Sequence, residues 1–209
     1  MGRNRLATGG WRLAAVAPAL AVVLTAGCSS EPLPSATRTP AALELQTFDF
    51  GGDFELPAHT GRTFRLADAR GKAVLLFFGY TYCPDICPTT LQTMTQVEKL
   101  LGADKDKLQT VFVSVDAERD TLPRLKEYVD HFGINAVAVT AAPAQIDPIV
   151  KQYAAYYEKQ ASESAMGYLV DHTSRLYLID PQGRIRYLFR YGEEAKTIAA
   201  GVRQVLGGA

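Results

Sequence analysis

One segment, Lys72–Tyr80 (KAVLLFFGY), constrains the fold of this chain more than any other. Its apolar residues follow one another without the polar alternation of a half-exposed strand, so the segment is predicted to be a central strand buried on both faces. Such a strand needs other elements packed above and below it. With 209 residues, 47% of them hydrophobic, the chain has room for one domain of ordinary size around this strand.

Helical and strand patterns alternate after this segment. Helices are predicted over 87–101, 122–132, 144–157 and 193–206, and strands over 109–115, 136–140, 175–180 and 185–191. Before it, residues 48–56 and 63–66 flank a turn at Gly61 and are predicted to form a hairpin. The order predicts an α/β, thioredoxin-like fold, with a mixed sheet, helices on both faces and an N-terminal hairpin extension.

The first 27 residues are organised like a bacterial export signal. Three arginines, at positions 3, 5 and 12, precede an apolar run over 13–24, and small residues follow it. The apolar run is too short to cross ~30 Å of hydrocarbon as a helix. Leu24–Cys28 (LTAGC) resembles the lipobox of bacterial lipoproteins, in which the cysteine is acylated and becomes the first residue of the mature chain.

The lipobox resemblance implies three parts: a signal peptide over 1–27, a lipid-anchored flexible linker over 28–46 that begins at Cys28, and the domain over 47–209. The linker is rich in Ser, Thr, Pro and Ala. The domain is then held on a membrane of the cell envelope, facing the periplasm or the cell exterior. Removing residues 1–27 leaves 19 basic and 22 acidic residues. No excess of basic residues points to nucleic acid as a partner.

Two further cysteines, Cys83 and Cys87, lie between the first buried strand and its helix. The carboxyl end of a central strand is where α/β sheets place ligands, and a helix N-terminus lowers the pKa of nearby thiols. At positions i and i+4 the two sulfurs can meet. Three interpretations remain open: a structural disulfide, a redox dithiol and a soft-metal site. Two thiolates suit Cu(I) but leave it short of ligands, so a metal site needs a third donor.

The chain has three histidines that could supply this third donor. His59 is predicted to lie on the surface in an early loop, and His131 near the end of a helix. His172 precedes the strand of the late hairpin, in a loop that faces the cysteine loop in the thioredoxin topology. Thioredoxins have a cis-proline there, which this chain lacks. An imidazole from His172 would complete a three-coordinate site with the two thiolates.

Three segments together resemble the Sco/SenC family of copper proteins. They are Phe78–Pro88 (FGYTYCPDICP), Val113–Thr121 (VSVDAERDT) and Tyr168–Thr173 (YLVDHT). The resemblance runs from about residue 48 to the C-terminus. Ala117 and Leu122 stand where the family usually has proline, and neither is at a ligand position.

This resemblance implies a membrane-tethered copper chaperone that binds Cu(I) and Cu(II) through Cys83, Cys87 and His172. It also implies a role in assembling the dinuclear copper centre of cytochrome c oxidase, by passing copper to it or by reducing its cysteines. The implied partners are the copper-centre subunit of the oxidase and another periplasmic copper chaperone. By position, Asp116 and Asp120 would lie near the site, where they either orient the ligands or cap the loop.

Two enzyme classes are alternatives, so enzymatic activity is left open. The fold and an exposed dithiol permit a thiol-disulfide oxidoreductase in which Cys83 and Cys87 form a redox disulfide pair. The longer cysteine spacing and the missing cis-proline count against it. A peroxidase of the peroxiredoxin type shares the fold, but only Thr81, two residues before Cys83, matches its motif.

Overall fold

The computed structural model describes residues 42–162 and 167–207. The predicted signal peptide, Cys28 and most of the predicted linker lie outside the described residues. The last linker residues, 42–46, are described and contact the domain. Leu43 exchanges two hydrogen bonds with the side chain of Gln204, at 3.0 and 2.9 Å, and the Gln46 N–H donates to the Arg186 carbonyl at 3.0 Å. The segment that packs on the domain therefore begins before residue 47.

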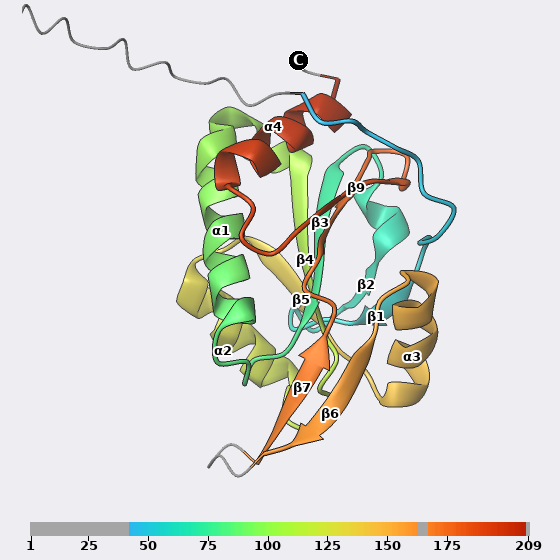
Figure 1. Ribbon diagram of the computed structural model, residues 1–209, viewed down its shortest axis with the longest axis vertical. Helices are drawn as coiled ribbons and strands as arrows, with labels where there is room; N and C mark the ends of the chain where they lie inside the picture. The colour runs from blue at the N-terminus through green and yellow to red at the C-terminus, as the bar shows by residue number, and fades with distance from the viewer. Residues whose placement is uncertain (1–41, 163–166, 208–209) are drawn as a thin grey trace, which may run out of the picture. The chain divides into compact units, whose positions relative to one another are not determined.

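A five-stranded mixed sheet forms the centre of the domain (Figure 1). In spatial order its strands are β5 (Ala136–Val139), β4 (Leu108–Ser114), β3 (Ala73–Gly79), β8 (Leu176–Ile179) and β9 (Ile185–Phe189). Strands β3, β4 and β5 are parallel, whereas β8 runs antiparallel to β3 and β9. Every residue of β3 is buried, because β3 has a strand on each side and a layer on each face.

Helices cover both faces of this sheet, as predicted (Figure 1). The helices are α1 (Ile86–Leu101), α2 (Leu122–Phe132), α3 (Pro143–Gln152) and α4 (Ala195–Val205), with 3-10 turns η1 (Leu66–Ala69) and η2 (Gly102–Lys107). Helices α1 and α4 pack against each other on one face. On the other face Tyr153, directly after α3, meets the rings of Phe78 and Tyr177 edge-on, both at 5.7 Å. No described helix has the length and apolar character to cross a membrane.

Two hairpins flank the sheet, and only one of them was predicted. Strands β1 (Glu55–Pro57) and β2 (Thr63–Arg65) form the expected N-terminal hairpin. The second hairpin, β6 (Tyr157–Ala161) and β7 (Tyr168–His172), begins at the residue where a helix was predicted to end. The histidine expected in a loop is therefore the last residue of a strand.

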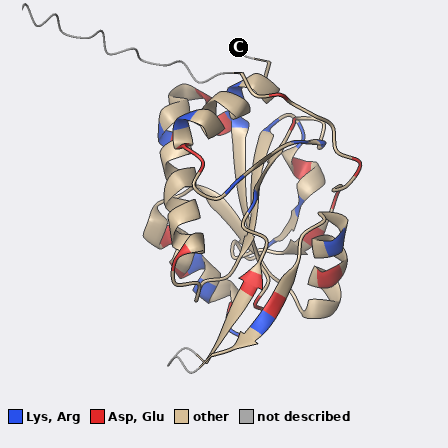
Figure 2. Cartoon of the chain, in the orientation of Figure 1, with Lys and Arg blue, Asp and Glu red and all other residues tan. Residues whose placement is uncertain are grey.

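The sequence did not predict this hairpin for two reasons: helix α3 ends earlier than expected, and the strands of the hairpin are polar. Helix α3 stops at Gln152, and the chain turns at Ala154, which alone among the described non-glycine residues has a positive φ, of 48°. Charged residues lie along β6 and β7, among them Glu158, Lys159 and Asp171 (Figure 2). This hairpin is packed from one side only, so it lacks the apolar run that marks a buried strand.

Gly79, the last residue of β3, is required by close packing beneath α1. A Cβ at this position would lie 2.8 Å from Cys87 Sγ and 2.8 Å from Phe112 Cε2. Both neighbours are fully enclosed, so neither can move aside cheaply. We expect Gly79→Ala to lower the free energy of unfolding by about 1–3 kcal/mol, measured by chemical denaturation, and to make Cys87 easier to alkylate.

Gly71→Ala is the matched control for this substitution. A Cβ at Gly71 meets nothing within 4 Å, although its φ of +85° makes any side chain strained. The control should therefore lose some stability and leave the alkylation of Cys87 unchanged. Wild-type stability in Gly79→Ala would contradict the packing argument.

Candidate metal centre

The loop from β3 to α1 brings the two cysteines together at the carboxyl end of the central strand. Cys83 lies in the loop and is half-buried, whereas Cys87 lies in the first turn of α1 and is 0% exposed. The Cys87 N–H donates to Cys83 Sγ over 3.4 Å. This N–H is free to do so because the first turn of a helix has no intrahelical acceptors for its amides. Both cysteines are free thiols.

His172 completes the group from the opposite side. As the last residue of β7 it is 9% exposed, and its Nε2 lies 3.3 Å from Cys87 Sγ. The rings of Phe77 and Tyr80 pack edge-on against the imidazole at 5.8 and 5.7 Å. Its Nδ1 lies 3.1 Å from the Thr173 carbonyl oxygen, which can only accept. Nδ1 can therefore donate to this carbonyl, and Nε2 is the ring nitrogen that faces the cysteines.

The three side chains form a donor set that fits a soft metal ion. Cys83 Sγ, Cys87 Sγ and a ring nitrogen of His172 all lie within 4.8 Å of one another, so one ion can contact all three. Two thiolates and one imidazole form a mixed sulfur and nitrogen set, which suits Cu(I). The hydrogen bond from His172 Nδ1 to a carbonyl also fixes the ring orientation, as is usual for metal-binding histidines.

The two thiols differ in protonation because they differ in burial and in hydrogen bonding. A hydrogen bond from the Cys87 thiol lowers the pKa of Cys83 to about 3, with further help from His172 and from the backbone amides of Cys87 and Asp85. Burial raises the pKa of Cys87, and its hydrogen bond to Cys83 adds to this effect. In the metal-free protein Cys83 is therefore the thiolate and Cys87 the thiol.

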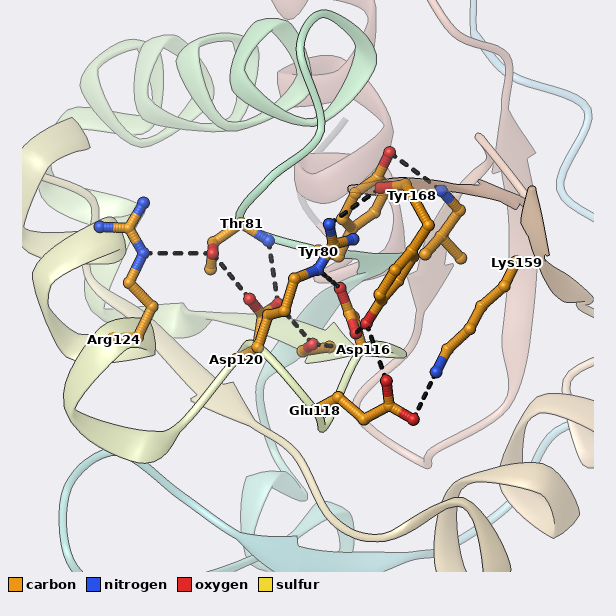
Figure 3. Close-up of polar contacts among 11 residues, drawn as sticks. Tyr80, Thr81, Asp116, Glu118, Asp120, Arg124, Lys159 and Tyr168 are labelled. Carbon is orange, nitrogen blue, oxygen red and sulfur yellow. Dashed lines mark hydrogen bonds and ion pairs between the residues drawn. The ribbon is translucent and has the colours of Figure 1, made fainter. Parts of the chain in front are cut away.

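The two predicted aspartates brace the site from the end of β4 (Figure 3). Asp120 accepts hydrogen bonds from the Thr81 N–H and hydroxyl, at 2.9 and 2.6 Å, and from the Ser114 hydroxyl at 2.6 Å. It thus ties the start of the cysteine loop to β4. Asp116 is buried and forms an ion pair with Arg119, whose Nε lies 2.6 Å from Asp116 Oδ2. The contacts of the two aspartates thus cap and brace the loop.

The other two histidines lie outside this group. His59 Nδ1 accepts a hydrogen bond from the Ala138 N–H of edge strand β5 at 3.0 Å, so this ring is partly buried rather than fully on the surface. His131 is exposed in the last turn of α2. Two aromatic rings, those of Phe77 and Tyr80, hold the imidazole of His172, and the sequence did not predict this contact. The one signal for these two residues was their position at the carboxyl end of the buried strand.

Comparisons with known proteins agree with this geometry. The family model described as SCO1/SenC matches residues 43–207. Protein SenC of Rhodobacter capsulatus is 37% identical over 191 residues, which cover 88% of this chain and 85% of that protein. The mitochondrial SCO2 homologs of Bos taurus and Mus musculus are 37% and 35% identical over 155 residues, and the matched region spans 58% and 61% of their length.

Two solved structures are informative. Bradyrhizobium japonicum ScoI with copper bound has a TM-score of 0.69 and 35% identity, and the match covers 75% of this chain and 99% of that one. BsSco is described as a member of the Sco family of cytochrome c oxidase assembly proteins and shares the fold, with a TM-score of 0.62 and 23% identity. That match covers 78% of this chain and 96% of the other.

The split protonation predicts unequal reactivity of the two thiols. Because the pKa of Cys83 is lowered to about 3, its alkylation by iodoacetamide in the metal-free protein should be almost as fast at pH 5 as at pH 8. An ordinary thiol, with a pKa near ~8.5, loses about tenfold in rate per pH unit below that value. Mass spectrometry of peptides that carry each cysteine measures both rates. Cys87 should react far more slowly.

The same chain unfolded in denaturant is the control, and there both cysteines should follow the ordinary profile. A rate for Cys83 in the folded protein that falls with pH as steeply as in the unfolded chain would contradict this assignment.

Proposed function

The chain belongs to the SCO1/SenC family, and we propose that it is a copper chaperone for the dinuclear copper centre of cytochrome c oxidase. The observation that carries this proposal is the convergence of Cys83, Cys87 and His172 within 4.8 Å. The copper in the related ScoI structure and the description of BsSco as one of the oxidase assembly proteins support it. The receiving partner is then the subunit of the oxidase that holds the copper centre.

Each donor contributes a different property to copper binding. Cys83 supplies a thiolate at once, whereas Cys87 must first lose its proton. Soft thiolates favour Cu(I), and the imidazole of His172 suits Cu(II) as well. Of the three donors Cys83 is the most exposed, so an incoming ligand of a partner reaches the metal from the Cys83 side. The buried donors Cys87 and His172 would thus hold the ion from the inside, and the ion would be accessible on the Cys83 side.

The thiolate character of Cys83 favours a second candidate function, thiol-disulfide exchange. The Cys83 thiolate would attack one sulfur of a partner disulfide and release the other sulfur as a thiolate, forming a mixed disulfide. Cys87 would then attack the Cys83 sulfur, its proton passing to the released thiolate. The products are a Cys83–Cys87 disulfide and a reduced partner, with one sulfur as a thiol and the other as a thiolate. Reduction of the oxidase cysteines by this route is compatible with copper delivery by the same site.

The N-terminal sequence supports a location for this activity. We propose that residues 1–27 are a signal peptide, that Cys28 carries lipid, and that the linker up to residue 46 joins the lipid to the domain over 47–209. The domain would then face the periplasm or the cell exterior. Another copper chaperone of the same compartment is the proposed donor of the metal.

Copper affinity tests the ligand set. The purified chain, reduced and kept in detergent, should bind one Cu(I), measured by competition with a chromogenic chelator. His172→Ala should weaken binding at least roughly 100-fold, because removal of a ligand should cost no less than the upper end of the range for an outer partner of a ligand. His131→Ala, which removes an exposed histidine outside the group, is the matched control and should bind like wild type. Equal affinity in wild type and His172→Ala would refute the assignment.

Cell fractionation tests the anchor. Cys28→Ser should move the protein from the membrane fraction to the soluble fraction, because each buried CH₂ of an acyl chain contributes ~0.8 kcal/mol to membrane binding. Cys83→Ser, which removes a cysteine of the site instead, should stay with the membranes. Membrane association that persists in Cys28→Ser would rule out a lipid anchor at this position.

A further inference from the structure

We propose that Arg119 is a positioning residue that holds His172 in place for copper, by joining the cysteine loop to β7. The proposal rests on the proposed copper-binding function. The guanidinium of Arg119 lies among the rings of Tyr82, which precedes Cys83, and Tyr168, which begins the strand that ends at His172. One side chain therefore contacts both segments that supply the donors.

The contact with β7 is the tighter of the two. Arg119 Cζ lies 3.6 Å from the centroid of the Tyr168 ring, and its Nη1 donates to the Tyr168 carbonyl at 2.8 Å. Arg119 thus contacts both the ring and the backbone of Tyr168. The Val170 N–H also donates to the hydroxyl of Tyr80, at 3.2 Å (Figure 3). Because a paired strand is stiff, fixing Tyr168 also fixes the far end of β7, where His172 pairs with Tyr157.

The contact with the cysteine loop is a cation–π interaction. Arg119 Cζ lies 4.8 Å from the Tyr82 ring centroid and 5.7 Å from that of Tyr80. Both distances are within the range where a cation is attracted to the face of a ring. A planar guanidinium stacks on aromatic faces in a way that a lysine ammonium does not, so this position favours arginine.

A buried acid fixes the direction of the guanidinium. Arg119 Nε donates to Asp116 Oδ2 at 2.6 Å, and the side chain of Asp116 is 0% exposed. The Tyr168 hydroxyl donates to the other oxygen of the same carboxylate (Figure 3). The ion pair between Glu118 and Lys159 also contacts Tyr168: Glu118 Oε2 accepts from the Tyr168 hydroxyl at 3.2 Å, and Lys159 Nζ lies 4.8 Å from the ring centroid. Both charged side chains are exposed, so this ion pair contributes little. The segment Val113–Thr121 therefore supports both sides of the site. Asp116 and Arg119 brace the β6–β7 hairpin, and Asp120 braces the cysteine loop.

Removing the guanidinium should affect the metal through His172. The buried carboxylate of Asp116 loses its cation, and Tyr168 loses its contacts to the cysteine loop. The strand that carries His172 is then less firmly placed relative to Cys83 and Cys87. A donor set that is already held within about 0.5 Å of its binding geometry binds metal more tightly than one that must rearrange on binding.

The test compares Arg119→Gln with Arg184→Gln. Arg184 Nε also donates to a buried aspartate, Asp180, at 2.9 Å, in the turn between β8 and β9. Asp180 has a second cationic partner, Arg186, at 3.2 Å. Arg119→Gln should weaken Cu(I) binding about tenfold, the lower end of the loss expected for an outer partner. Arg184→Gln should change it by less than about twofold, because Asp180 does not touch the donor segments. Equal effects of the two substitutions would overturn the proposal.

A double-mutant cycle separates positioning from general destabilisation. If Arg119 acts through His172, then Arg119→Gln in a His172→Ala background should cause no further loss of affinity. Losses that multiply in the double variant would overturn the proposal. Tyr168→Leu, which removes the stacked ring and leaves the Arg119–Asp116 pair, serves if Arg119→Gln does not fold. It should give the same tenfold loss and the same lack of effect in the His172→Ala background.

Hydrogen exchange in the metal-free protein keeps this test independent of copper. Amides of β7 should exchange faster in Arg119→Gln than in Arg184→Gln, and equal exchange would overturn the proposal. Failure of the wild-type chain to bind Cu(I) would instead refute the proposed function, and the exchange rates would then decide the role of Arg119 alone.

Discussion

The contact between Cys87 Sγ and His172 Nε2, 3.3 Å long, joins two segments that are 85 residues apart, and the fold around it keeps that contact in place. Strand β3 leads into the loop before α1, in whose first turn Cys87 lies, and Gly79 leaves room for the Cys87 sulfur. The hairpin delivers His172, and the rings of Phe77 and Tyr80 fix the imidazole plane. A donor pair this enclosed cannot be formed by either segment alone, so the site exists only in the folded domain.

Burial also sets the chemistry of the donors. Burial raises the pKa of Cys87 and keeps it a thiol, whereas Cys83 lies nearer the surface, accepts several hydrogen bonds and is a thiolate. A metal ion that takes both sulfurs must therefore displace a proton from the inner one. The outer sulfur is available at once, both to an arriving ion and to a partner's disulfide. The same asymmetry thus serves copper binding and thiol exchange, which explains why one pair of cysteines supports both candidate functions.

The sequence was informative where the pattern is local and uninformative where it depends on distant packing. The apolar run over 72–80 predicts β3, and the boundaries of α2 follow from Thr121, which caps it, and Gly133, which ends it. The β6–β7 hairpin is half-exposed and charged, so it left no apolar pattern. The stack of Arg119 on Tyr168 joins residues 49 apart, and no spacing rule identifies such a pair. The donor residues themselves were predicted from their places in the expected topology and from the family resemblance, and their distances come only from the fold.

X-ray absorption at the copper edge of the Cu(I)-loaded, reduced chain tests the central claim most directly, because it counts the donors by element. The structure predicts a three-coordinate ion with two sulfur neighbours and one imidazole nitrogen, and His172→Ala should lose the imidazole signal while keeping both sulfurs. A sulfur-only shell in the wild-type chain, or an imidazole signal that survives in His172→Ala, would contradict the account.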